Sequence, residues 1–159
     1  MSLTDTAGRI ELGWREWLAL PGLGLPAIKA KIDTGARTSA LHAWMIEPFT
    51  DGGASWVRFY MHPVQRRTDI SIACVAPVAD CRMVRDSGGH AERRYVIESD
   101  VVLGDRRWPI EITLTDRDTM RFRMLLGRQA LSGLCVSAGD SFLTAPPLTR
   151  AQAARHYRA

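Results

Sequence analysis

Apolar and polar residues alternate along much of this chain, which is the pattern of strands with one buried face and one exposed face. In the segment IKAKID at residues 28–33, every second residue is apolar until the run ends on Asp33. Gly35 then permits a sharp turn. Apolar stretches at residues 9–20, 56–61 and 70–78 predict further strands. The first half of the chain therefore indicates β-structure.

The second half predicts two hairpins. Residues 82–85 and 93–97 flank the turn sequence Asp-Ser-Gly-Gly-His, and residues 101–103 and 108–114 flank Gly104-Asp105. Residues 124–127 predict a short buried strand that ends on glycine, and residues 128–131 one helical turn. Residues 38–46 fit either a strand or a short helix, and residues 134–136 and 142–143 predict the last strands. The sum is an all-β domain with one short helix.

Size and composition fit one globular domain. The 159 residues are 46% apolar and 24% charged, with 13 Gly and 8 Pro spread along the chain as in a protein of many turns. Pro146-Pro147 marks the expected domain edge, which gives a domain over residues 1–147 and a basic tail over residues 148–159. No apolar run is long enough to cross a membrane and no secretory pattern opens the chain, so we expect a cytoplasmic protein. Reduced thiols are expected for the three cysteines, which are Cys74, Cys81 and Cys135.

The net charge of +4 comes almost wholly from arginines, several of them in pairs. Such pairs fit either an anionic partner or solvated strand faces. No nucleic-acid-reading motif accompanies the charge, so we expect no nucleic-acid partner.

The triplet Asp33-Thr34-Gly35 is a candidate catalytic motif. On its own it is a weak signal, because an Asp that caps a tight turn gives the same pattern. Here it follows an alternating strand and is matched downstream by Leu125-Leu126-Gly127. The stretches KIDTGA, SGG and MLLGRQAL resemble, in that order, the catalytic loop, the flap tip and the bracing segment of the retropepsin family of aspartic proteases. The resemblance runs over residues 28–136 and implies a single-lobe β-barrel of the acid-protease type with a flap hairpin.

The chain is more similar still to a bacterial family of small retropepsin-like proteins. GWREW, IKAKIDTGARTSALHA, SGGH, ERRYVI and RFRMLLGRQAL carry this resemblance. That family has been labelled "ATP-dependent zinc protease", and its members are often associated with ATP-grasp ligases that add glutamate to proteins. The resemblance implies that Asp33 is catalytic. It also implies that the catalytic loop is supported by Thr34, Gly35, Ala36, Leu125, Leu126 and Gly127. The flap tip that binds substrate would consist of Ser87, Gly88, Gly89 and His90.

Zinc and ATP, which that label names, have no recognisable ligands in the sequence. There is no His-Glu-x-x-His motif, and the four histidines stand apart at His42, His62, His90 and His156. Cys74 and Cys81 have no second cysteine pair to complete a zinc site, and no Gly-rich loop ends in Gly-Lys-Ser or Gly-Lys-Thr. We therefore expect neither a metal nor a cofactor.

Peptide hydrolysis without a metal or a nucleophile needs one group to activate water and another to protonate the carbonyl. Two carboxylates that share one proton fill both roles. This chain has one Asp-Thr-Gly, so the mechanism that the resemblance implies requires a C2 homodimer with one Asp33 from each subunit. Retroviral members carry an Asp four residues after the catalytic Asp, and it pairs with the Arg that follows the bracing Gly. Here the two positions are Arg37 and Arg128, so we expect a dimer interface that is built differently.

Two other functions stay open. One is a non-catalytic retropepsin-like domain that binds peptides and partners a glutamate ligase, with Asp33 as a structural turn residue. The other is a zinc hydrolase, in which His42 and His90 would converge with a carboxylate. The expected substrate is a peptide or protein. An acidic one is a candidate because arginines lie in or beside the flap at Arg82, Arg85, Arg93 and Arg94, although arginines that only keep an exposed hairpin soluble are an equal alternative.

Overall fold

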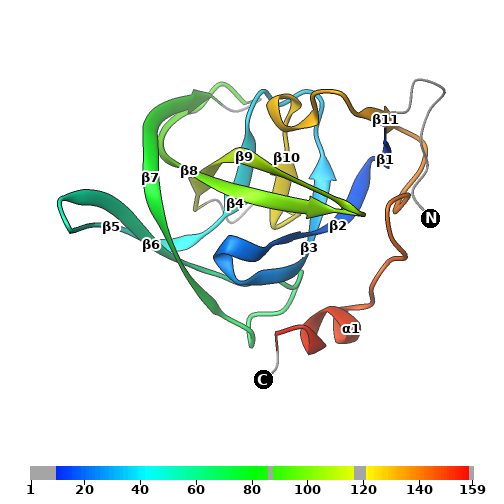
Figure 1. Ribbon diagram of the computed structural model, residues 1–159, viewed down its shortest axis with the longest axis horizontal. Coiled ribbons are helices and arrows are strands. Elements are labelled where there is room, and N and C mark those ends of the chain that lie inside the picture. Colours follow the sequence, from blue (N-terminus) through cyan, green and yellow to red (C-terminus); the bar gives the residue numbers. More distant parts are fainter. Residues whose placement is uncertain (1–9, 86–87, 117–120, 158–159) are drawn as a thin grey trace.

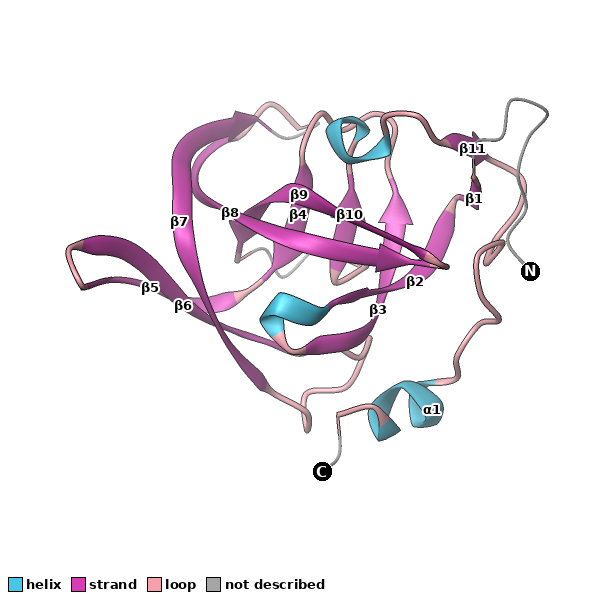
Figure 2. Ribbon diagram, viewed as in Figure 1, coloured by secondary structure: helices cyan, strands magenta, loops and turns pink. Residues whose placement is uncertain are grey.

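The computed structural model describes residues 10–85, 88–116 and 121–157. Strands dominate this part of the chain, and its helical segments are short (Figures 1 and 2). The strands are β1 (Glu11–Gly13), β2 (Arg15–Leu20), β3 (Leu25–Ile32), β4 (Ser39–His42), β5 (Trp44–Asp51), β6 (Ala54–Met61), β7 (Ile72–Arg85), β8 (Ala91–Leu103), β9 (Arg106–Thr115), β10 (Met124–Leu126) and β11 (Cys135–Ser137). The helical segments are η1 (Pro21–Leu23), η2 (Arg128–Leu131) and α1 (Arg150–Arg155). The all-β fold class expected from the sequence is confirmed.

Most of the strands belong to one sheet, which closes into a barrel. Its order is β2-β3-β10-β4-β9-β8-β7-β6-β5. Strand β2 pairs with β3 and, at Ala19 and Val102, also with β8, so the strands from β2 to β8 in that order form a closed ring. Strands β7, β6 and β5 continue the sheet beyond the ring, and the β5–β6 hairpin projects from one side of the molecule (Figure 1). Strands β1 and β11 form a separate parallel pair.

Strand β10 is inserted between β3 and β4, and this insertion determines where the Asp33 segment lies. Strand β10 runs parallel to β3, with Leu126 opposite Ile32, and antiparallel to β4. Parallel neighbours end at the same edge of a sheet. The segments that follow Ile32 and Leu126 therefore leave the barrel side by side, although they are far apart in the sequence.

The alternation in the sequence marks the core of the barrel correctly. In β3, Ile28 and Ala30 are fully buried and Ile32 is 5% exposed, whereas Lys31 lies at the surface. Large buried side chains from β6, β9 and other strands, such as Phe59 and Ile112, complete the interior. Each such side chain contributes roughly 1.5–3 kcal/mol relative to an exposed position.

Glu16 is an ionisable residue on the buried face of β2, with no exposed surface. Its carboxylate accepts hydrogen bonds from the backbone N–H groups of Gly13 (2.7 Å) and Leu143 (2.9 Å). It also accepts from the backbone N–H (3.2 Å) and the hydroxyl (2.7 Å) of Thr144. These four bonds compensate for the loss of water around the carboxylate. Glu16 thus fastens the segment after β11 to the start of the barrel.

Two local expectations from the sequence differ from the structure, and one open alternative is decided by it. Residues 9–20 do not form one strand, because the chain breaks at Trp14, whose backbone N–H donates to the carbonyl of Asp140 (2.8 Å). Residues 142–143 form no strand, since Phe142 has a φ of 56° and the N–H of Leu143 binds Glu16. Residues 38–46 are strands β4 and β5 rather than a helix. The expected helical turn over residues 128–131 is present as the 3-10 segment η2.

The segment that ends the described chain packs back on the barrel. Helix α1 begins at the capping box of Thr149 and Gln152, and its residues Ala153 and Ala154 are fully buried. Beyond it, the Tyr157 hydroxyl hydrogen-bonds to both the backbone N–H and the carbonyl of Ala27 in β3, and burial raises the pKa of Tyr157 to about 12. None of the helices in the described ranges has the length and apolar character needed to cross a lipid bilayer.

Candidate active site

The loop that carries Asp33 is a compact turn at the end of β3. The backbone N–H of Asp33 donates to the carbonyl of Leu126 (2.8 Å), which ties the loop to the end of β10. The N–H of Gly35 donates to the carboxylate Oδ1 of Asp33 (3.0 Å), and the N–H of Ala36 donates to the Asp33 carbonyl (3.2 Å). Asp33 is half-buried, whereas Thr34 and Gly35 are exposed. The turn thus presents a carboxylate that is partly oriented by its own backbone.

Gly127 braces this loop through a close backbone contact. A Cβ atom at this position would lie 2.5 Å from the carbonyl carbon and oxygen of Thr38, so no other residue fits without movement of the backbone. Its N–H donates to the Ser39 hydroxyl (3.1 Å). Leu126 is buried beneath the loop, and Leu125 is partly exposed beside it. The residues for which the sequence suggested a supporting role are therefore in one place.

A cleft of about 990 Å³ separates the Asp33 loop from the hairpin of β7 and β8. Its lining on the loop side includes Asp33, Gly35, Ala36, Leu125 and Arg128. Its lining on the hairpin side includes Arg82, Met83, Val84, Arg85 and Arg94. Met83 is 63% exposed and gives this side of the cleft an apolar surface. An extended peptide fits a space of this kind, between a carboxylate and a strand hairpin.

The β7–β8 hairpin lies across the cleft from the Asp33 loop. Strands β7 and β8 pair as far as Arg85 and Ala91. At the tip, Gly88, Gly89 and His90 are exposed, and Gly89 has a φ of 82° that favours glycine. Ser87, which the sequence assigns to the same tip, lies outside the described residues.

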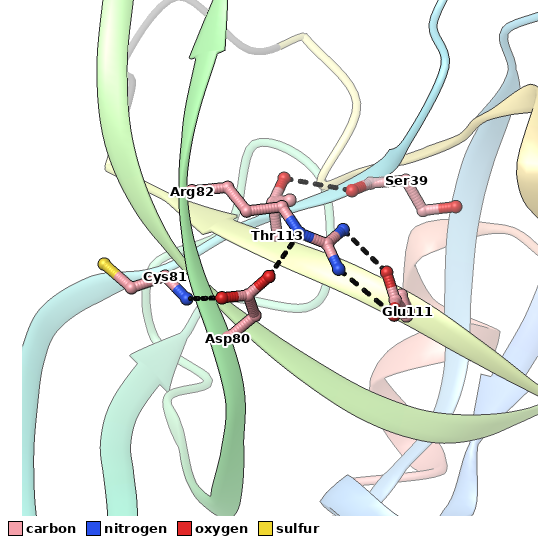
Figure 3. A network of polar contacts seen from close by, with 6 residues as sticks. All are labelled: Ser39, Asp80, Cys81, Arg82, Glu111 and Thr113. Atoms are coloured by element: carbon pink, nitrogen blue, oxygen red, sulfur yellow. Dashed lines mark hydrogen bonds and ion pairs between the residues drawn. The ribbon is translucent and has the colours of Figure 1, made fainter.

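A network of charged side chains ties the base of the hairpin to the barrel wall (Figure 3). The Arg82 guanidinium donates from Nε to Asp80 (2.6 Å) and from both terminal nitrogens to Glu111 on β9 (2.7 and 3.3 Å). The hydrogen bond from Arg82 is the main cause that lowers the pKa of the Asp80 carboxyl. Both acceptors are well exposed, so solvent screens this network and it orients Arg82 more than it stabilises the fold.

Arg94 lies opposite Arg82 on the paired strand and is only 7% exposed. Its Nη1 donates to the Thr113 hydroxyl (3.3 Å), which itself donates to the Ser39 carbonyl (3.0 Å). Its Nε lies 3.4 Å from a carboxylate oxygen of Glu92, which is an ion-pair distance, but this nitrogen has no hydrogen-bond partner in the part of the chain described. Arg94 thus places a guanidinium, paired with Glu92 and Thr113, at the wall of the cleft.

The cleft has more positive than negative groups. Two carboxylates, Asp33 and Glu111, line it together with five arginines, which are Arg37, Arg82, Arg85, Arg94 and Arg128. Of the four flap arginines singled out in the sequence, Arg82, Arg85 and Arg94 thus face the cleft. Arg93 is exposed and is not part of the lining. Sequence reasoning did not find Ser39, Thr113 or the burial of Arg94. The alternation of β8 was the available signal for Arg94, because residues 94 and 96 share a face.

The donor atoms near the cleft do not fit a zinc ion. Within the described ranges, no group of three or more His, Cys, Asp and Glu side chains converges. His62 hydrogen-bonds through Nδ1 to the carbonyl of Ile70 (3.2 Å), and its ring stacks on Trp44. Burial raises the pKa of Cys74 to about 12, so that it stays a thiol rather than the thiolate that binds zinc.

Comparison with known proteins decides the family. A profile of the RimB-like family, described as "Retropepsin-like aspartic endopeptidase RimB", matches residues 11–142. The chain belongs to this family. The matched range of this RimB-like chain includes the Asp33 loop, the bracing Gly127 and the β7–β8 hairpin. The family resemblance that the sequence motifs suggested is therefore confirmed.

A solved structure has the same fold. It is the crystal structure of Lpg0085 from Legionella pneumophila, a protein of unknown function, which superimposes with a TM-score of 0.70 at 26% sequence identity. The superposition covers 84% of this chain and 97% of the Legionella protein.

Curated relatives carry a different name. A probable alpha-L-glutamate ligase of Parasynechococcus marenigrum is 52% identical over 125 residues, and one of Shewanella pealeana is 48% identical over 132 residues. These matches cover 79% and 82% of this chain but only 27% and 29% of the ligases. The chain therefore spans less than a third of the length of these relatives.

Proposed function

We propose that this chain is an aspartic peptidase that hydrolyses peptide bonds in a peptide or protein substrate. The observation that carries the proposal is the position of Asp33, half-buried in a braced turn that faces a cleft of about 990 Å³. Membership of a family described as aspartic endopeptidases supports it. A reducing cytoplasmic location is proposed as well, since Cys74 and Cys81 are free thiols.

The proposed reaction uses two Asp33 carboxylates, one from each subunit of a C2 homodimer, which share one proton. The ionised carboxylate takes a proton from water, and the water oxygen attacks the carbonyl carbon of the scissile bond. The protonated carboxylate gives its proton to the carbonyl oxygen. In the second step the carboxylate that lost its proton takes one from a hydroxyl of the tetrahedral gem-diol, the C–N bond breaks, and the nitrogen receives a proton from the other carboxylate, so that the pair again shares one proton. No bond to the enzyme forms at any point.

A test of the homodimer is the dependence of peptide cleavage on protein concentration. We expect the rate per subunit to fall when the protein is diluted below its dimer dissociation constant, because a monomer holds one Asp33 and lacks the second carboxylate. Sedimentation velocity over the same concentrations should show the loss of dimer in parallel with the loss of cleavage.

A strictly monomeric protein that still cleaves peptides would contradict the proposed mechanism. Cleavage that disappears in excess chelator and returns with zinc would favour a zinc hydrolase instead. A protein without cleavage at any concentration would favour the second candidate, a non-catalytic domain that binds peptides and partners a glutamate ligase. The names of the relatives favour that candidate, because these proteins are probable alpha-L-glutamate ligases that contain a similar segment.

The substrate that best suits the cleft is an acidic peptide. Arginines outnumber carboxylates in its lining, and guanidinium groups bind carboxylates in bidentate fashion. Arg82 is bound by Asp80 and Glu111, whereas Arg94 lines the cleft with a more distant carboxylate, that of Glu92 at 3.4 Å. We therefore propose Arg94 as the residue that selects a Glu or Asp side chain of the substrate.

The neighbouring pair Arg93 and Arg94 gives a matched test of this preference. Arg94→Gln should lower kcat/KM for an acidic peptide by about ten-fold or more and leave a neutral peptide nearly unchanged, because a charge-assisted hydrogen bond is lost. Arg93→Gln, which removes the same charge outside the cleft, should change neither value. Equal effects of the two variants on the ratio of acidic to neutral cleavage would rule out Arg94 as the selecting residue. The thermal midpoints of both variants should be measured as well, because substitution of the buried Arg94 also affects stability.

A further inference from the structure

Arg128 lies against the loop that carries Asp33. It is the first residue of η2 and directly follows the bracing Gly127. Its Nη1 donates to the carbonyl oxygens of Thr34 (3.2 Å) and Gly35 (3.3 Å). Its backbone N–H donates to the carbonyl of Ala36 (2.8 Å). Three consecutive carbonyls of the loop are thus bound by one residue.

Two backbone N–H groups of the same loop donate hydrogen bonds to Asp33. The N–H of Gly35 donates to Oδ1 of Asp33, and the N–H of Ala36 donates to the Asp33 carbonyl. The carbonyl of Thr34 and the N–H of Gly35 belong to one peptide group, and the carbonyl of Gly35 and the N–H of Ala36 belong to the next. Two consecutive peptide groups therefore connect the guanidinium of Arg128 to Asp33.

A peptide group transmits orientation because it is planar, with its carbonyl and its N–H pointing in opposite directions. A donor that holds the oxygen consequently fixes the direction of the N–H. A cation on the oxygen also polarises the group, which makes the N–H a stronger donor. Gly35 would otherwise let this peptide rotate, since glycine restricts its neighbours least.

We propose that Arg128 is a positioning residue for the reaction. It holds the two peptide groups so that the Gly35 N–H orients the Asp33 carboxylate and the Ala36 N–H holds the Asp33 backbone carbonyl within each subunit. Since Arg37 replaces the aspartate of retroviral members, no acidic side chain at that position competes for the guanidinium. The inference rests on the proposed peptidase function, but its structural part is measurable without catalysis.

The structural test is the amide proton resonance of Gly35 in the full-length protein. Arg128→Gln should move it upfield, because a weakened hydrogen bond to the Asp33 carboxylate lowers the chemical shift. Arg107→Gln is the matched control, since Arg107 pairs with Asp100 outside the cleft. An unchanged Gly35 resonance in folded Arg128→Gln would overturn the proposal.

The kinetic test uses a neutral peptide, so that any binding of an acidic side chain by Arg128 does not enter. Arg128→Gln should lower kcat about ten- to a hundred-fold with KM within about two-fold, as expected for a misplaced catalytic group. Arg128→Lys should retain more activity, and guanidinium ion at non-denaturing concentration should restore part of the activity of Arg128→Ala. A change confined to KM, or no rescue by either route, would overturn the positioning role. If the wild-type protein cleaves nothing, the proposed function fails while the Gly35 resonance still decides the structural part.

Discussion

Asp33→Asn should reduce peptide cleavage by about three orders of magnitude or more while the fold stays intact. The amide has the size of the carboxyl, and its oxygen can still accept the hydrogen bond from the N–H of Gly35 (3.0 Å in the wild-type protein). It can neither take a proton from water nor share one with a partner carboxylate, so both proton transfers are lost. The measurement is the rate of peptide cleavage at saturating substrate, together with the thermal midpoint.

Asp51→Asn is the control for the change of charge. Asp51 is exposed at the end of β5, in the hairpin that projects from the barrel. The Asp51→Asn variant should cleave peptides at the wild-type rate. Cleavage by Asp33→Asn within ten-fold of the wild type would show that the reaction does not depend on this carboxylate, whatever the fold.

Glu16→Ala should lower the free energy of unfolding by about 3–5 kcal/mol. The substitution removes the acceptor of four hydrogen bonds and leaves the N–H groups of Gly13, Leu143 and Thr144 without it. Water cannot replace the carboxylate freely, because the site has no exposed surface. Urea denaturation monitored by tryptophan fluorescence measures the change.

Two further variants separate charge from shape at this site. Glu11→Ala removes a carboxylate from the neighbouring strand β1, where it is partly exposed, and should cost less than about 1 kcal/mol. Glu16→Gln should give an intermediate loss, because its amide nitrogen faces N–H groups that it cannot accept from. Equal stability of Glu16→Ala and Glu11→Ala would show that the carboxylate of Glu16 does not hold the end of the domain.

Alternation and turn residues predicted most of the barrel because these signals are local. Strand β3, the hairpin of β8 and β9, and the turn at Asp33 all follow from residues next to one another in the sequence. The burial of Glu16 was not predictable in this way, since a charged residue in a strand is normally assigned to the solvent face. Its partners also come from a segment more than a hundred residues away.

The candidate site was predicted in its residues but not in its contacts. Asp33 and the segment from Leu125 to Gly127 were found from motifs, and the structure places them side by side. The burial of Arg94 was missed although it shares a strand face with the apolar Val96, and alternation alone does not say that this face also borders the cleft. The contacts of Arg128 within the subunit were not predicted either. Its expected opposite was the side chain of Arg37, whereas its actual partners are backbone carbonyls, which any sequence supplies.

The insertion of β10 between β3 and β4 has a consequence for the order of events during synthesis. The Asp33 loop is held by Leu126 and Arg128, which the ribosome adds more than ninety residues after it. Contacts of such long sequence separation form late and slowly, because a large loop must close first. A nascent chain that has exposed β3 but not β10 therefore has no braced turn around its carboxylate. On the proposed function, a complete site therefore arises only after nearly the whole barrel has left the ribosome.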